Sequence, residues 1–262
     1  MISLTSAQLD AWIAMLMYPM ARILGFITSA PLWNSAGVSR RVRLMLGIAL
    51  TFGLLPILPP MPNVAPASGT GLWILAQQML IGIGMGFAAR LLFAAVDLTG
   101  SFISMQMGLG FATLYDPQNT AQTPVLSSFI GLLAMLVFLS MNGHLIYVSV
   151  LARSFEAIPV GIRVLGPDSW LNLVLLGGEI FSFGLLLALP VLIALLITNL
   201  TLGVLTRAAP QLNIFSIGFP FPISAGMFSL LVGMQYLPVP LERLFDRATQ
   251  AMIGFAVLAG SR

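Results

Sequence analysis

Residues 170–205 read WLNLVLLGGEIFSFGLLLALPVLIALLITNLTLGVL, and this apolar run decides the fold class. At 1.5 Å per residue, one straight helix of about 36 residues would extend about 54 Å. The hydrocarbon core of a bilayer is only about 30 Å thick, so the run predicts a membrane helix that is strongly tilted or broken. Pro190 can supply a kink, because proline removes one helical hydrogen bond.

The rest of the chain has the same character. Of its 262 residues, 58% are hydrophobic and 7% are charged, and the mean hydropathy is +1.01. These values lie far from those of soluble globular domains and predict an integral, all-α membrane protein. The apolar runs are approximately Trp12–Trp33, Leu44–Leu58, Leu72–Val96, Val125–Leu151, Trp170–Leu205 and Ile214–Leu237, followed by a shorter amphipathic stretch, Leu241–Leu258.

The charged and nucleophilic residues exclude several functions. The chain has no cysteine, which excludes disulfides, thiolate catalysis and cysteine metal sites. Its net charge of +3 is spread along the sequence, without a basic block that would bind nucleic acid. His144 is the single histidine, and no nearby carboxylate completes a metal site, so we expect a packing histidine, no metal and no cofactor. A nucleophile elbow is also missing, so we expect no enzymatic activity.

The arginines do not define a simple topology. If all six long runs crossed the membrane, cytoplasmic loops should collect arginine on one side. Instead, Arg40, Arg41, Arg43 and Arg207 fall on one side, and Arg153, Arg163, Arg243, Arg247 and Arg262 on the other. Either one run does not cross, or the helices do not form a conventional bundle of spans.

Four charged residues lie within the apolar runs or at their margins: Arg22, Arg90, Asp97 and Glu179. A charge in a membrane is costly unless it is paired or faces water. Arg90 and Asp97 are two helical turns apart, a separation that disfavours a direct pair. We therefore expect partners on other helices or subunits, or snorkelling to an interface, and interpret the four as subunit-packing charges. Direct transport chemistry is the alternative.

The glycines of Gly82-Ile-Gly-Met-Gly86 admit two interpretations. A nucleotide-binding loop would follow a strand and open a helix in a βαβ unit, whereas this motif lies inside an apolar run. Small residues four apart are typical of close helix packing, so we assign Gly82 and Gly86 to a helix contact.

The segment 107–124 reads MGLGFATLYDPQNTAQTP and interrupts the apolar runs. Irregular backbone cannot face lipid, because its N–H and C=O groups would stay unsatisfied, so the segment must lie against protein or water. Loops of this length are uncommon without a role, although a plain connection remains the alternative.

The same region resembles a known family. Gln106–Gln118 (QMGLGFATLYDPQ), followed by Gln122–Phe129 (QTPVLSSF), is similar to the signature region of the FliR family, the flagellar biosynthetic proteins of the type III secretion export gate. The patterns Trp12…Pro19…Arg22…Ala30-Pro31, Arg40-Arg41-Val42-Arg43 and Ser154-Phe155…Ile158-Pro159 are similar too, so the resemblance covers essentially the whole chain. The stretches Ala188–Leu196 and Ala208–Phe215 resemble the helical hairpin of FliQ, the small partner subunit.

The resemblance implies a FliP-like part, residues 1–165, joined to a FliQ-like hairpin with a C-terminal amphipathic helix, residues 166–262. It implies about six long apolar helices arranged as bent helical hairpins. In the family, one FliR chain assembles with FliP and FliQ copies into a helical cone with which FlhB associates. Unfolded flagellar proteins would pass through this channel in the bacterial inner membrane, at the flagellar basal body, in contact with lipid.

With this resemblance, segment 107–124 is interpreted as a plug that blocks the resting channel. Its glycines allow backbone conformations that other residues resist, its apolar side chains supply a seal, and its end makes a turn. The residues assigned to the plug are Met107, Gly108, Leu109, Gly110, Phe111, Leu114, Tyr115, Asp116 and Pro117.

Two alternatives to the flagellar export gate remain open. A virulence-type (injectisome) export-gate subunit would share the architecture implied by the resemblance. A self-contained secondary transporter would show internal repeats with matched broken helices and a polar site at mid-membrane, whereas the halves of this sequence are unequal.

Overall fold

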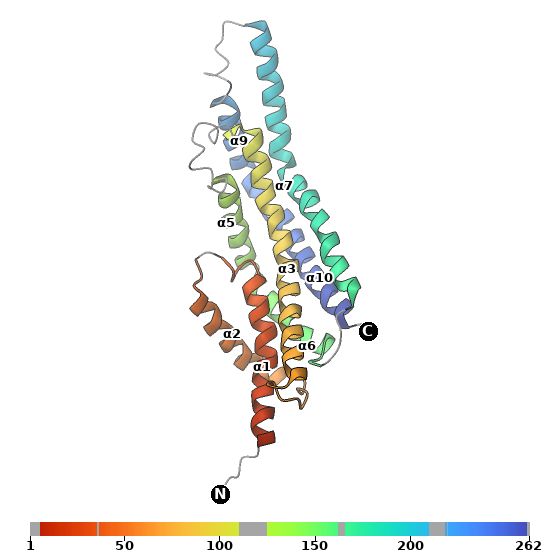
Figure 1. The fold of residues 1–262 in the computed structure, drawn as a ribbon. Coiled ribbons are helices and arrows are strands. Elements are labelled where there is room, and N and C mark those ends of the chain that lie inside the picture. The colour runs from red at the N-terminus through yellow and green to blue at the C-terminus, as the bar shows by residue number, and fades with distance from the viewer. Residues whose placement is uncertain are drawn as a thin grey trace, which may run out of the picture. The chain divides into compact units, whose positions relative to one another are not determined.

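We describe a computed structural model of the chain over residues 6–35, 37–109, 125–161, 166–209, 218 and 220–260 (Figure 1). Over these residues the regular structure is helical, without a strand, which confirms the predicted all-α fold. The elements are α1 (Ser6–Ser29), α2 (Arg40–Leu54), η1 (Leu55–Ile57), α3 (Gly69–Gln106), α5 (Val125–Ser140), α6 (Gly143–Ala157), α7 (Pro167–Ala208), α9 (Pro220–Gly233), η4 (Met234–Tyr236) and α10 (Pro238–Gly260).

Several helices are long and apolar enough to cross a membrane. Within the described ranges, α3 and α7 meet this test by length and composition, as does Gln8–Ser29 of α1. Two bent pairs qualify when each is taken as one span: α5 with α6, bent by 68°, and Pro220–Tyr236 with Pro238–Leu258, bent by 65°. The described residues therefore supply three candidate spans, or up to five with the bent pairs.

The bend between α5 and α6 divides the apolar run Val125–Leu151 into two helices. Asn142 has φ 57° and ψ 27°, the left-handed conformation that ends helices and that asparagine tolerates better than most residues. The N–H groups of Leu145 and Ile146 then donate to the Asn142 carbonyl at 2.9 and 3.2 Å and start α6.

The helix α7 continues through Pro190 for 42 residues. The sequence predicted either a strongly tilted helix or a broken one, and the structure shows no break at Pro190. Because proline lacks an N–H, α7 nevertheless forgoes the hydrogen bond that residue 190 would donate to the Leu186 carbonyl.

By its contacts the chain divides into two compact units. Unit 1 comprises residues 1–91, 142–177 and 246–262, and unit 2 comprises residues 92–141 and 178–245. The sequences of α3, α7 and α10 each contribute to both units. This division describes packing, and the division into FliP-like and FliQ-like parts at residue 165 stays a prediction.

Unit 1 is built on the contact between α1 and α3, which lie side by side in Figure 1. The helix α2 packs on α1 through Gly47, where an added Cβ would collide with the side chain of Leu24. The Tyr18 hydroxyl donates to the Val64 carbonyl at 2.9 Å and ties α1 to the loop before α3. Buried apolar side chains such as Ile23 fill the space between these elements.

Unit 2 is built on the C-terminal part of α3. The Thr99 hydroxyl donates to the carbonyl of Gly184 on α7 at 3.1 Å as well as to the Ala95 carbonyl at 2.9 Å. Three rings from α3, α5 and α10 form a cluster with centroids 5.1–5.4 Å apart: Phe93, Phe138 and Phe245. Aromatic pairs at such distances add to the stability given by apolar burial.

Candidate functional site

The end of α3 fixes the start of segment 107–124. Gly108 has φ 78°, the left-handed conformation in which glycine commonly ends a helix, and its N–H donates to the Met105 carbonyl at 3.1 Å. The Met107 side chain is 1% exposed and fills the space beside Gly226 of α9, where a Cβ would lie 2.8 Å from its sulfur. The chain therefore leaves α3 from a fixed point in unit 2.

The far end of the segment is held to the same helix. The Ser127 hydroxyl, in the first turn of α5, donates to the Asp97 carbonyl at 3.0 Å and lies 3.2 Å from the Ser101 hydroxyl. Gly100 allows this approach, because a Cβ there would lie 2.7 Å from the Ser127 backbone nitrogen. The described residues on either side of 110–124 are thus held within unit 2, Met107 against Gly226 of α9 and Ser127 against α3.

The predicted plug residues fall into two groups. Met107 and Gly108 form the anchor, and Leu109, which follows it, is 37% exposed. The other six lie outside the described residues: Gly110, Phe111, Leu114, Tyr115, Asp116 and Pro117. Their role in a plug stays a prediction.

Arg22 is fully buried in unit 1 and joins three elements. Its Nε donates to Gln78 Oε1 of α3 at 2.8 Å. Its Nη1 donates to the carbonyl and hydroxyl oxygens of Ser154 at 2.9 and 3.2 Å, and its Nη2 donates to the Ile158 carbonyl at 2.8 Å. The guanidinium carbon lies 4.1 Å from the centre of the Phe155 ring.

The partners of Arg22 among the described residues are neutral. Two of its acceptors are carbonyls at the C-terminal end of α6, where the helix dipole places partial negative charge that favours a cation. The ring of Phe155 adds a cation–π contact. Arg22 was expected to find a partner on another helix or subunit, and the structure places its hydrogen bonds inside its own chain. A part in subunit packing stays a prediction.

The other three charges lie nearer the surface. Arg90 and Asp97 are exposed on α3, and Glu179 is half-buried on α7. The hydroxyl of Ser101 donates to the Asp97 backbone carbonyl at 3.0 Å. The structure thus separates Arg22, a core residue of unit 1, from these three, for which a role in packing against other subunits also stays a prediction.

Gly82 and Gly86 lie against the backbone of α1. A Cβ at Gly82 would collide with the Arg22 carbonyl oxygen, and one at Gly86 would lie 2.8 Å from the nitrogen of Ala30. The two helices can approach this closely only because both positions lack a side chain. The same contact brings Arg22 within reach of Gln78 on α3.

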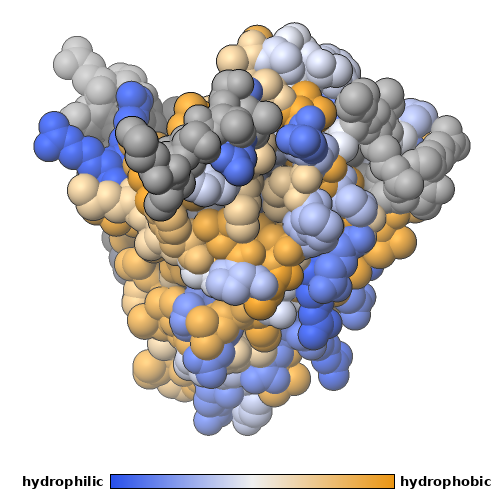
Figure 2. Space-filling model, turned by 90° about the horizontal axis from the view of Figure 1, so that it is seen from below, coloured by the Kyte–Doolittle hydropathy of each residue, from blue (hydrophilic) through white to orange (hydrophobic). Residues whose placement is uncertain are grey.

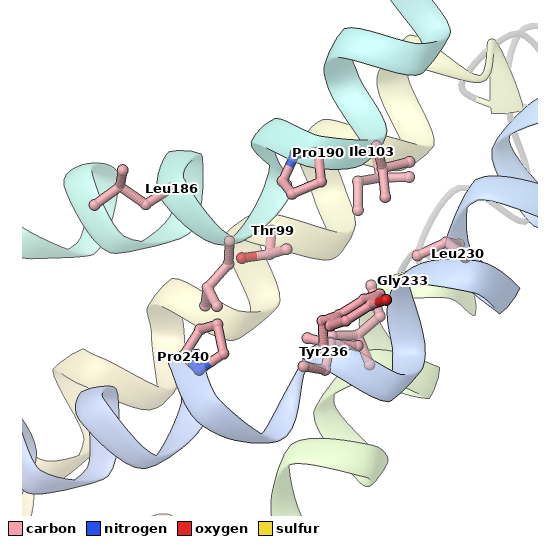
Figure 3. A pocket seen from close by; sticks show the side chains of 12 residues that line it. Thr99, Ile103, Leu186, Pro190, Leu230, Gly233, Tyr236 and Pro240 are labelled. Carbon is pink, nitrogen blue, oxygen red and sulfur yellow. The ribbon is translucent and has the colours of Figure 1, made fainter.

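Unit 2 also contains an apolar cavity of about 100 Å³ beside Pro190. Figure 3 shows Thr99 and Ile103 of α3 facing Pro190 across it, with Tyr236 of η4 at another side. The hydroxyls of Thr99 and Tyr236 are the polar side-chain groups among the residues that line it. The lining offers no charged or strongly nucleophilic group.

Sequence reasoning missed the acceptors of Arg22. Gln78 stands with Gln77 as a polar pair inside the apolar run Leu72–Val96, and such a pair is a signal of a buried polar contact. Ser154 and Ile158 belong to a pattern used only for the family resemblance. Over the described residues, no group of three histidine, aspartate or glutamate side chains has a geometry that would hold a metal ion.

Much apolar surface is left uncovered by the chain itself. In the most apolar part of α7 only 22% of residues are buried, compared with 61% for α3. Figure 2 shows hydrophobic residues over the middle and left of one face, with hydrophilic residues along its right side and lower edge. These features define an all-α membrane protein with tightly packed polar and glycine contacts inside each unit and apolar faces left for lipid or neighbouring subunits.

Comparison with known proteins places this membrane protein in a family. A family model described as bacterial export proteins, family 1, matches residues 13–248. The flagellar biosynthetic protein FliR of Escherichia coli K12 is 42% identical over 247 residues, which cover 94% of each chain. FliR of Aquifex aeolicus is 32% identical over 86% of this chain and 87% of its own length. The chain belongs to the FliR family of flagellar biosynthetic proteins.

Family membership establishes the general role. The chain is a membrane-embedded flagellar component that acts in flagellar protein export together with other export components. The relatives are flagellar, so the flagellar assignment is favoured over the virulence-type one.

Proposed function

We propose that the chain forms, with FliP-like and FliQ-like subunits, the channel through which unfolded flagellar proteins cross the bacterial inner membrane. An FlhB-like subunit would associate with this assembly. The FliP-like part would be residues 1–165 and the FliQ-like part residues 166–262. The exposed apolar surface of α7 supports the need for neighbouring subunits.

Segment 107–124 is the plug of this channel. The observation that carries the proposal is the double anchoring of the segment: Met107 is buried against Gly226, and Ser127 is bonded to the backbone of α3. A plug needs fixed ends, so that it returns to the same place after each substrate has passed. Apolar residues between the anchors would exclude water and ions from the closed channel.

The plug is tested by removing its apolar side chains without changing its length. The variant Phe111→Ser/Leu114→Ser should assemble normally and leak small ions, because the closed channel loses its seal. Ion leak is measured as membrane depolarisation in cells that make the whole export apparatus, and export as secreted flagellar protein.

The matched control is Gln118→Ser/Asn119→Ser, which changes two polar residues of the same segment and should not leak. If the Phe111/Leu114 variant assembles and the membrane stays as tight as with the wild-type chain, segment 107–124 is not the plug. A deletion within residues 108–115 gives a second, stronger disturbance of the same seal.

A further inference from the structure

The helix α2 is too short to cross a membrane, yet it presents an apolar face. Its 15 residues extend about 22 Å, less than the thickness of the hydrocarbon core. One side packs on α1 through the buried residues Gly47 and Thr51. Five apolar side chains are 43–70% exposed elsewhere on the helix: Val42, Leu44, Met45, Ile48 and Phe52.

Arg41 continues this apolar face at the start of the helix, and Arg40 lies next to it, nearer the side of Gly47. Arg41 is four residues before Met45 and seven before Ile48, so the three share one face of α2. Arg40 and Arg41 are exposed, and within the described residues neither has a hydrogen bond or ion pair. Arg43 differs, because its Nη1 donates to Asn34 Oδ1 at 2.7 Å and its Nη2 to the Ser35 carbonyl at 3.2 Å.

Helix stability does not explain Arg40 and Arg41. The N-terminal end of a helix carries partial positive charge, so cations there are disfavoured. The cap is already provided by Ser39, whose hydroxyl accepts a hydrogen bond from the Val42 N–H at 3.4 Å. Neither the cap nor the helix dipole therefore accounts for the two arginines.

We propose that α2 lies in the membrane interface and binds anionic phospholipid headgroups through Arg40 and Arg41. A short helix with arginines beside exposed apolar side chains has the chemistry of an interfacial anchor. The apolar face of Met45, Ile48 and Phe52 contacts the acyl chains near the headgroups. The guanidinium groups match the phosphates of the headgroups in charge and in hydrogen-bonding geometry.

The absence of cysteine from the natural chain makes a direct test possible. The substitution Met45→Cys provides an attachment point for a fluorophore that is unique in this chain, at a side chain that is 70% exposed. The labelled full chain, purified with its co-expressed export components, is placed in vesicles of phosphatidylcholine and phosphatidylglycerol. Spin-labelled phosphatidylglycerol or spin-labelled phosphatidylcholine is then added as the quencher.

We expect spin-labelled phosphatidylglycerol to quench the fluorophore more strongly than spin-labelled phosphatidylcholine does. The apparent preference should fall by about fivefold for each arginine removed in Arg40→Gln and Arg41→Gln, and it should weaken in high salt. Arg153→Gln is the matched control, because it removes an exposed arginine from α6 and should leave the preference unchanged.

Three outcomes would overturn the proposal. Equal quenching by both lipids would show that α2 has no headgroup preference. A preference that survives in the Arg40→Gln/Arg41→Gln variant would assign it to other residues. Quenching of the Met45→Cys label by neither lipid, while both spin-labelled lipids quench a fluorescent lipid added to the same vesicles, would show that protein rather than lipid covers α2.

Discussion

At the scale of single residues, Arg22 shows how the interior of unit 1 accommodates a buried charge. The guanidinium is surrounded by acceptors in three directions: the Gln78 side chain, Ser154 and the Ile158 carbonyl. A planar fork with fixed donor directions suits this arrangement, whereas a single ammonium group does not. The geometry of the donors, beyond the charge itself, determines the packing of α1 against α3 and α6.

Replacing Arg22 by lysine should therefore destabilise the protein although the charge is kept. The lysine ammonium cannot reach all the acceptors, and the loss of charge-assisted hydrogen bonds should cost about 2–4 kcal/mol. The expected result is a clear fall in the denaturation temperature of the detergent-purified protein. Arg90→Lys on the exposed side of α3 is the control and should change stability by less than about 0.5 kcal/mol. Equal stability of the two variants would contradict the role assigned to the fork.

The sequence identified Arg22 as an unusual residue but not its environment. A charge inside an apolar run is visible in any single sequence. Its acceptors are 56, 132 and 136 positions away, and only the folded chain brings them together. The close contact at Gly82 and Gly86 was predictable, because small residues four apart are a local pattern.

At the scale of elements, the sequence predicts where apolar helices lie better than where they bend. The run Val125–Leu151 contains no proline, so its division at Asn142 has only the weak signal of an asparagine followed by a glycine. Pro190 gave the opposite result, because α7 continues through it. The start of α2 at Arg40 depends on the cap by Ser39, which lies before the apolar run that marked this helix.

The bend at Asn142 can be tested by backbone preference. Asn142→Ile should destabilise the protein by about 1–2 kcal/mol, because a β-branched residue resists the left-handed conformation at φ 57°. Asn142→Gly keeps this conformation accessible and should leave stability nearly unchanged. Both variants are compared by denaturation temperature and by the amount of protein in membranes. If isoleucine were tolerated as well as glycine, the bend would not depend on the conformation of this residue.

At the scale of the whole molecule, the buried and the exposed apolar residues of α7 have different roles. The buried residues contribute to folding of the chain, and the exposed ones to its assembly. Leu195 is fully buried within the chain, whereas Leu200, on the same helix, is 71% exposed. Both are leucines in one apolar run, and the sequence does not tell them apart. The FliQ-like assignment of this helix does not distinguish them either, since lipid and protein neighbours both favour leucine.

The two leucines predict different defects when they are made polar. Leu195→Gln buries an amide in unit 2 and should reduce the amount of the chain itself, even when it is made alone. Leu200→Gln should leave that amount unchanged and reduce co-purification with FliP-like and FliQ-like subunits. The measurement is the ratio of co-purified subunit to chain, at matched expression. Equal co-purification by the Leu200→Gln variant and wild type would mean that lipid rather than a subunit covers this position.

The hydrogen bonds of Arg22 have a consequence for biosynthesis. Ser154 is made 132 residues after Arg22, a delay of roughly 7 to 26 seconds at ribosomal rates. During this interval α1 carries a charge without most of its acceptors, and such a helix is costly to place alone in a bilayer. We therefore expect the first helix of this chain to wait at the membrane surface or beside the insertion machinery until α6 arrives, so that it enters the membrane late although it is made early.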